Sequence, residues 1–155
     1  MRITKRSNIA MRVLMFCAVH SDRLVTKAEI AARAQVSESH LAQIINRLAQ
    51  LGYLDTQRGR NGGLSLALPA GAIVIGEVFR VLEPAFPDTE CFADADDSCP
   101  LKAACRLRPA IEAAAEAFYA HLDGITLGAL VCDNAALESA FSPMGCVSVK
   151  RVVPA

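Results

Sequence analysis

Apolar residues near the start of the chain recur at the spacing of amphipathic helices. Between Asn8 and His20 they fall at steps of three and four residues, so they share one helical face. They are Ala10, Val13, Leu14 and Cys17. Further on, Thr26-Lys27-Ala28-Glu29 is typical of a capping box, in which a threonine hydroxyl and a glutamate carboxylate satisfy each other's backbone amides. This pattern predicts a second, short helix that ends near Ala34.

A third helix is predicted from Ser37, which can cap it, to about Leu51. Two short helices joined by a tight turn, the second with a polar face, are typical of a helix-turn-helix. Alternating segments at Tyr53–Gln57 and Leu64–Leu68 then predict two strands, and the Asn-Gly pair between them favours a hairpin turn. The fold class is therefore mainly α, a winged helix-turn-helix with a two-stranded wing.

The second half of the chain predicts one short helix, a loop and one long helix. The short helix runs from about Ile73 to Leu82, and the Asp-rich segment 84–105 has the composition of a loop. From Arg106 to about Gly124 the apolar stripe returns, and it consists of Ile111, Ala114, Ala115, Phe118 and Leu122. So long a stripe predicts pairing with the same helix of a second subunit, aided by Leu127, Leu130 and Val131.

We therefore expect four regions. They are a winged helix at residues 1–83, a cysteine-bearing loop at 84–105, a dimerisation helix at 106–133 and a flexible tail at 134–155.

The charge of the chain is zero overall but unevenly distributed. Residues 1–70 hold ten basic against four acidic side chains, a net charge of +6, whereas residues 71–155 hold six against twelve, a net charge of −6. A basic half of this kind suits a polyanionic partner. The longest apolar run, residues 13–19, is too short to cross a membrane, and no cleavage site follows the basic N-terminus. We expect no membrane association and a cytoplasmic protein.

The polyanion predicted from these patterns is double-stranded operator DNA. The helix that follows Ser37 would enter the major groove and present Ser37, Ser39, His40 and Gln43 to base edges. Basic side chains better placed to neutralise phosphates are Lys27, Arg47 and Arg12. In the hairpin, Arg58 and Arg60 stand among glycines that allow a close approach to a minor groove, the alternative being a solvated hairpin tip.

Three of the six cysteines lie close together in one segment of the acidic half. Seven residues separate Cys91 from Cys99 and five separate Cys99 from Cys105, without the close Cys-x-x-Cys pair that zinc sites prefer. An iron–sulfur cluster tolerates wider spacing, because each thiolate binds a different iron. Spacing alone leaves three readings open, namely a cluster, a thiol switch and cysteines without a ligand.

Four motifs, in this order, resemble those of the winged-helix iron–sulfur transcriptional regulators, the family that includes NsrR, RirA and IscR. The resemblance covers residues 1 to about 133, and the motifs are Met1-Arg2-Ile3-Thr4-Lys5, Arg58-Gly59-Arg60-Asn61-Gly62-Gly63, Val78-Phe79-Arg80-Val81-Leu82-Glu83-Pro84 and Cys91…Cys99-Pro100…Cys105. The resemblance implies a homodimer on a palindromic operator. It also implies that Cys91, Cys99 and Cys105 hold a cluster whose state sets DNA affinity.

Within the family, Leu82-Glu83-Pro84 and Cys105-Arg106-Leu107 look most like the nitric-oxide-sensitive NsrR repressors. The iron-responsive RirA type is a close second, since it shares the Arg-Gly-Arg-Asn-Gly-Gly hairpin and an asparagine at the position of Asn8. The resemblance implies a [4Fe-4S] cluster, with [2Fe-2S] as the alternative. NsrR repressors complete the cluster with a partner aspartate, where this chain has Asn8, a poorer ligand for iron. The fourth ligand could therefore be Asn8 of the partner subunit, a loop carboxylate, water or a small thiol.

A redox enzyme or a metal-handling protein that uses the cysteines without DNA is the competing class. The sequence shows no constellation of catalytic bases and no nucleotide motif, and this class would leave the basic half unexplained. We therefore expect no enzyme but a cluster-dependent repressor, with nitric oxide as its signal and iron or general redox sensing as the alternative.

Overall fold

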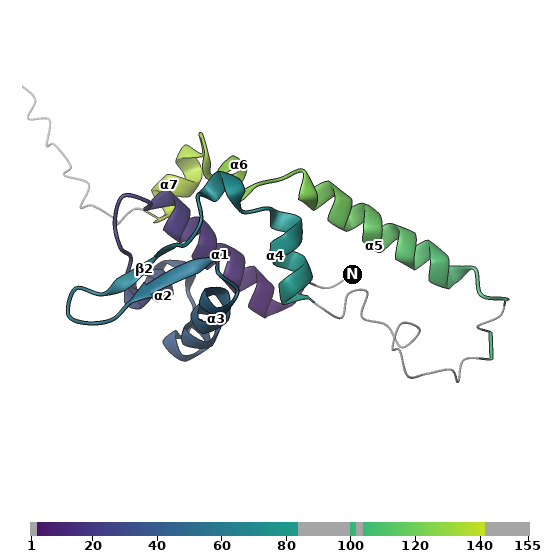
Figure 1. Ribbon diagram of the computed structural model, residues 1–155, viewed down its shortest axis with the longest axis horizontal. Coiled ribbons are helices and arrows are strands. Elements are labelled where there is room, and N and C mark those ends of the chain that lie inside the picture. Colours follow the sequence, from purple (N-terminus) through teal and green to yellow (C-terminus); the bar gives the residue numbers. More distant parts are fainter. Residues whose placement is uncertain (1–2, 84–99, 102–103, 142–155) are drawn as a thin grey trace, which may run out of the picture.

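The computed structural model describes residues 3–83, 100–101 and 104–141. Its elements, in chain order, are α1 Lys5–Val19, α2 Lys27–Ala34, α3 Glu38–Gln50, β1 Leu54–Gln57, β2 Gly63–Leu66, the 3-10 turn η1 Ala70–Ala72, α4 Ile75–Leu82, α5 Leu107–Asp123, α6 Leu127–Val131 and α7 Ala135–Phe141. The fold class is the expected one, a mainly helical chain with a two-stranded antiparallel wing (Figure 1). None of the described helices is long and apolar enough to cross a membrane.

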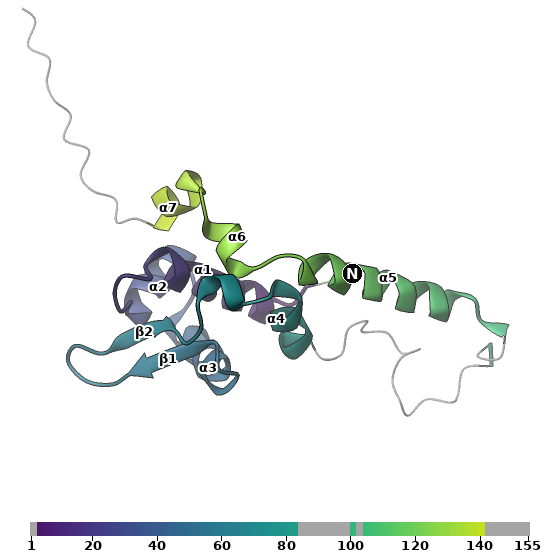
Figure 2. The same cartoon turned by 45° about the horizontal axis from the view of Figure 1, so that its top comes forward.

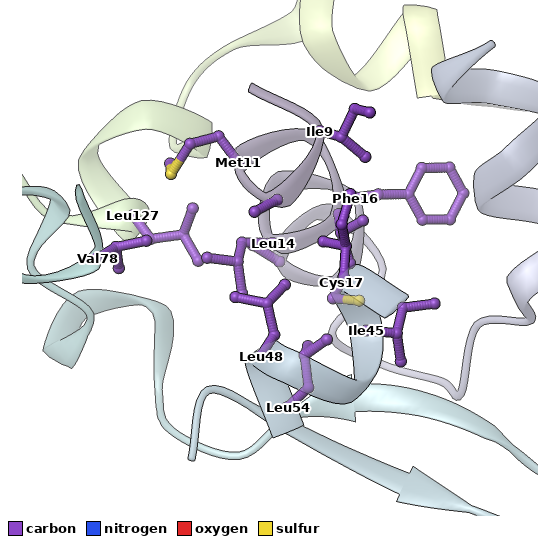
Figure 3. Close-up of a cluster of buried hydrophobic side chains, with 14 of the residues drawn as sticks. Ile9, Met11, Leu14, Phe16, Cys17, Ile45, Leu48, Leu54, Val78 and Leu127 are labelled. Atoms are coloured by element: carbon purple, nitrogen blue, oxygen red, sulfur yellow. The ribbon is translucent and has the colours of Figure 1, made fainter. Parts of the chain in front are cut away.

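Helix α1 forms the centre of the core, and the other elements of the winged helix surround it (Figure 3). Leu14 is fully buried and faces Leu48 of α3, while Leu127 of α6 lies beside Val78 of α4. Full burial of a leucine side chain stabilises a fold by about 1.5–3 kcal/mol. Cys17 is 2% exposed, and burial raises the pKa of its thiol to about 12, so this cysteine is a core residue, as its helical spacing predicts.

The first helix begins at Lys5, three residues before the predicted start at Asn8. Thr4 caps it, since its hydroxyl oxygen accepts a hydrogen bond from the Ser7 N–H at 3.2 Å. The first turn, Lys5-Arg6-Ser7, is polar in sequence and therefore gave no apolar periodicity to find.

The helix-turn-helix has the predicted capping box. The Thr26 hydroxyl oxygen accepts from the Glu29 N–H at 3.2 Å, and Glu29 Oε2 accepts from the Thr26 N–H at 2.7 Å. This second hydrogen bond is the main reason why the pKa of Glu29 lies below its ordinary value. Ser37 stands at the N-cap position of α3, but its hydroxyl makes no capping hydrogen bond and lies 3.1 Å from His40 Nδ1 instead.

The wing is the antiparallel pair β1–β2, in which Leu54 lies opposite Leu66 and Gln57 opposite Gly63. The predicted Asn-Gly turn is wrong, since such a turn needs positive φ at both residues. The residue with positive φ in this loop is Gly59, at 113°, and its carbonyl accepts from the Gly62 N–H at 3.0 Å. Strand β2 also ends at Leu66 rather than Leu68.

Helix α5 packs against α4 through its C-terminal half, and its first turns extend beyond the body of the molecule (Figures 1 and 2). Phe118 meets Phe79 edge to face, with ring centroids 6.2 Å apart. Arg80 forms a two-pronged ion pair with Asp123, at 2.6 and 2.7 Å, and lies 4.7 Å from the centre of the Tyr119 ring. Gly76 permits this close approach, because a Cβ at that position would collide with the Asp123 carboxylate.

Two expectations about the C-terminal region need correction. Leu127 is fully buried in the core of its own chain, so it is unavailable to a second subunit. The expected flexible tail instead contains α7, whose Phe141 is 8% exposed and meets Phe16 edge to face at 5.1 Å. Residues 142–155 of the expected tail lie outside the described residues.

Candidate DNA-binding surface and cysteine loop

The exposed face of α3 carries the polar residues that the sequence assigns to base edges. Ser39, His40, Gln43 and Arg47 are all exposed. Their steps of three and four residues place them on adjoining positions of one helical face. On the opposite side, Leu41, Ile44, Ile45 and Leu48 are buried and fix the helix to the core. The core therefore holds α3 with its polar face outward, as major-groove recognition requires.

A pocket of about 180 Å³ lies between the start of α1 and the exposed side of α3. Its walls are Lys5, Arg6 and Ile9 of α1 with His40, Gln43 and Ile44 of α3. Lys5 and Arg6 contribute to the charge of the basic half, but no sequence pattern assigned them to the DNA-binding surface. The pocket forms because α1 packs against α3, and no pattern within one helix indicates that contact. In the sequence, only the adjacent cations Lys5 and Arg6 hint at an anion site.

The wing presents Arg58 and Arg60 on either side of Gly59, and both side chains are exposed. Among the described residues, neither guanidinium is held by a hydrogen bond or an ion pair. The hairpin projects from the body at the end opposite to the first turns of α5 (Figures 1 and 2). Both arginines are therefore free to contact a partner that also contacts α3.

Two of the predicted phosphate contacts have structural roles in the helix-turn-helix. Arg12 donates to the Ala34 carbonyl at 3.0 Å and so satisfies the end of α2. Lys27 Nζ lies 3.4 Å from Glu38 Oε2, a pair that ties the start of α2 to the start of α3. Both side chains nevertheless remain exposed, Lys27 to 45%.

The cysteine loop begins where α1 and α4 meet. Glu83, the last described residue before the loop, accepts from the Thr4 N–H at 2.8 Å and from the Thr4 hydroxyl at 2.7 Å, both at Oε1. Partial burial would raise the pKa of Glu83, but hydrogen bonds from Ser7 and Thr4 outweigh it, and the pKa lies below its ordinary value. The end of α4 is therefore joined to the first turn of the central helix.

Of the predicted cluster ligands, Cys105 is described, whereas Cys91 and Cys99 lie outside the described residues. Cys105 is half-buried, carries a free thiol and stands two residues before α5 begins. Asn8 is exposed on α1. Within the described ranges, no group of three or more His, Cys, Asp or Glu side chains is positioned to hold a metal ion.

Thiolates are the usual ligands of iron–sulfur clusters, so a thiol at this place suits such a cluster. Cys105 meets this requirement, as its sulfur takes part in no disulfide and remains partly accessible. Cys132, by contrast, is exposed and donates to Asp133, and the hydrogen bond to that carboxylate raises the pKa of its thiol.

Comparison with known proteins adds to this geometry. The family model described as "Rrf2: Iron-dependent Transcriptional regulator" matches residues 3–133. The chain is similar to the HTH-type transcriptional regulator NsrR of Geobacillus kaustophilus, with 43% identity over 90% of this chain and 95% of that protein. It is 41% identical to the HTH-type transcriptional repressor NsrR of Streptomyces coelicolor, over 84% of this chain and 88% of that protein.

Among solved structures, IscR of T. potens superposes with a TM-score of 0.67 at 23% identity, covering 94% of each chain. This likeness concerns the fold, and it agrees with the winged helix and the extended α5 described above.

Proposed function

Since the chain belongs to the Rrf2 family of transcriptional regulators, we propose that it is a homodimeric iron–sulfur repressor that releases operator DNA in response to nitric oxide. Members of this family regulate transcription and are not enzymes, and the relatives named NsrR support repression. The observation that carries the DNA-binding part of the proposal is the exposed polar face of α3, together with two exposed arginines of the wing that no hydrogen bond or ion pair engages among the described residues. We assign the protein to the cytoplasm, where its operator DNA lies.

On the DNA, α3 would enter the major groove. Gln43 offers an amide that can form two hydrogen bonds with adenine, and His40, Ser39 and Ser37 offer further donors and acceptors to base edges. Arg47 and Lys27 would neutralise phosphates, while Arg58 and Arg60 would reach a minor groove beside them. Arg12 would serve the fold and the DNA together, because one guanidinium nitrogen satisfies the end of α2 while the side chain stays exposed.

A homodimer would form along α5. Leu107 is 64% exposed and Leu101 is 68% exposed, although both are large apolar side chains. Three of the five residues of the predicted stripe are already used within the chain, since Ala115 is buried and Phe118 and Leu122 pack against the core. The remaining apolar surface near the start of α5 suits the same surface of a second copy, which would place two α3 helices about 34 Å apart, one turn of DNA.

The cluster would be held by Cys91, Cys99 and Cys105, with Asn8 of the partner subunit as a possible fourth ligand. When bound, it would supply iron that nitric oxide can reach. The chain's own contribution is positional, because Glu83 joins the start of the loop to Thr4 at the start of α1. A change in the loop would thus reach the helix that supports α3.

Spectroscopy on protein purified without oxygen tests the ligand assignment. We expect Cys105→Ser, and likewise serine at Cys91 or Cys99, to abolish the visible absorbance of the cluster, because an alcohol replaces a thiolate ligand. Cys132→Ser is the matched control, an exposed thiol outside the loop, and should keep the absorbance. Retention of colour in all three loop variants would refute the assignment.

Iron sensing is the second candidate, favoured by the family description "Iron-dependent" and by the neutral Asn8. Two titrations of the loaded protein separate the candidates, one with nitric oxide and one with an iron chelator, each followed by operator binding. Loss of binding with nitric oxide at intact iron supply supports the first candidate. Loss with the chelator alone supports the second.

A further inference from the structure

We infer that the pocket between α1 and α3 receives a phosphate of the operator backbone, held by Lys5 and Arg6. This inference rests on the proposed DNA binding and adds to the protein–DNA contacts a helix turn that lies outside the helix-turn-helix and the wing. The pocket has about 180 Å³ of space and joins both residues to His40 and Gln43 of the recognition helix.

The charge of the pocket selects an anion. Lys5 and Arg6 are two of its six lining residues, and none of the six is acidic. Both side chains are exposed, and among the described residues no hydrogen bond or ion pair engages either of them. A phosphate oxygen accepts charge-assisted hydrogen bonds from ammonium and guanidinium groups.

The position of these two cations is unfavourable for the helix that carries them. Lys5 and Arg6 occupy the first turn of α1, which contains no acidic residue. The helix dipole disfavours positive charge at this end, so neither residue is explained by the stability of α1. Residues that oppose the preference of their own helix and gain nothing structurally often belong to a binding site.

The surroundings select DNA over a free anion. His40 and Gln43 form one wall of the pocket and belong to the face of α3 that is proposed to read bases. A strand whose bases meet Gln43 must pass its backbone along the edge of that helix. Thr4, which caps α1 and donates twice to Glu83, holds the first turn in place, so Lys5 and Arg6 are positioned before DNA arrives.

The test compares Lys5→Gln, Arg6→Gln and the double variant with the parent protein. The probes are an operator duplex, obtained by selection with the parent from a random-sequence pool, and a duplex of unrelated sequence. Both substitutions remove a cation from a helix N-terminus, so they should leave the thermal unfolding of the protein unchanged or slightly raised. Arg23→Gln is the matched control, because it removes the same charge from a guanidinium already paired with Glu29 at 3.0 Å.

We expect each single variant to bind both duplexes several-fold more weakly than the parent. A plot of log affinity against log salt should become shallower by about one unit per lost contact, hence about two per homodimer. Arg23→Gln should keep the slope of the parent. Affinities and slopes equal to those of Arg23→Gln would overturn the phosphate assignment, and so would a loss confined to the operator, which indicates base reading.

The failure of this inference can be distinguished from failure of the proposed function. If Arg60→Ala weakens operator binding by the roughly five- to 150-fold expected of a direct contact while Lys5→Gln and Arg6→Gln do not weaken it, the repressor stands and the pocket contact is wrong. If selection with the loaded parent recovers no preferred duplex at all, the proposed function itself fails.

Discussion

The winged-helix body and helix α5 differ in how far their apolar faces are covered within the chain. In the body, the apolar faces of α1, α3 and α4 cover one another, and Leu14, Leu41 and Leu48 are fully buried. Helix α5 has the same alternation of apolar and polar positions, yet only its C-terminal half finds a partner among the described residues, on α4. At its other end Leu107 remains 64% exposed.

This difference shows where each region obtains its stability. The body needs nothing beyond its own chain, so it can present α3 and the wing rigidly to DNA. The first half of α5 exposes apolar surface that a single chain leaves uncovered, which is typical of a segment that completes its packing in an assembly. The helix proposed to form the dimer thus leaves apolar surface for a second copy, whereas the region proposed to read DNA covers its apolar faces within one chain.

The largest effect is expected in the body. Leu14→Ala should lower the free energy of unfolding by about 2–5 kcal/mol, because it leaves a cavity at the centre of the core. Leu107→Ala is the control, since the same change at an exposed site should stay within about 0.5 kcal/mol when the protein is dilute enough to be monomeric. Equal losses in urea titrations of the two variants would erase the contrast between the regions.

The joint between the two regions is the next target. Gly76→Ala should cost about 1–3 kcal/mol of stability, because the added methyl group collides with Asp123 and separates α5 from α4. Hydrogen exchange should then speed up in the C-terminal half of α5. Gly71→Ala, where a Cβ meets nothing within 4 Å, is the control and should leave exchange in α5 unchanged. Unaltered protection in Gly76→Ala would mean that α5 is not held by this contact.

A pair of neighbouring substitutions tests the unpaired half of α5. Ala114→Asp places a charge on the predicted apolar stripe, and Ala113→Asp places the same charge outside it, although both alanines are exposed in the single chain. We expect Ala114→Asp to raise the dimer dissociation constant tenfold or more, about 1.4 kcal/mol, and Ala113→Asp to change it little. Sedimentation equilibrium measures both. Identical dimerisation of the two variants would remove α5 from the interface.

The smallest effect concerns the boundary at Glu83. Its pKa lies below the ordinary value of 4.5, so its contribution to stability is full above about pH 4.5 and is lost as the pH falls through the lower, folded value. Glu83→Gln should therefore make unfolding below pH 4.5 less dependent on pH, while stability near pH 7 decreases slightly. Acid titrations of both proteins, followed by circular dichroism, provide the comparison. If the stability of both proteins fell equally with pH below 4.5, Glu83 would not stabilise this junction.

Features fixed by neighbouring residues were predictable from the sequence. The capping box of α2, the turn before α3 and the alternation of the wing strands all rest on residues close in the chain. The early start of α1 was missed, because its first turn is polar and shows no apolar periodicity. Helix α7 was missed for another reason, since its Phe141 packs on Phe16, which is distant in the sequence.

The candidate site also combines features set by local sequence with features that only helix packing creates. Exposed positions on α3 and in the wing followed from helical and strand periodicity. Gln43, Arg47, Arg58 and Arg60 are exposed as this periodicity implies, and their contacts with DNA stay a prediction. The hydrogen bond from Arg12 to Ala34 could not be predicted, because it joins two helices. The pocket that joins Lys5 to the recognition helix arises only when α1 packs against α3, and periodicity within one helix contains no information about that pairing.

The central claim, that the state of the cluster sets DNA affinity, is tested most directly by one measurement. Protein purified without oxygen, with its cluster intact, is titrated onto its selected operator before and after stoichiometric nitric oxide. Regulation requires different affinities in the two states. We predict tight binding before nitric oxide and a strong loss after it, and equal affinities would contradict the account.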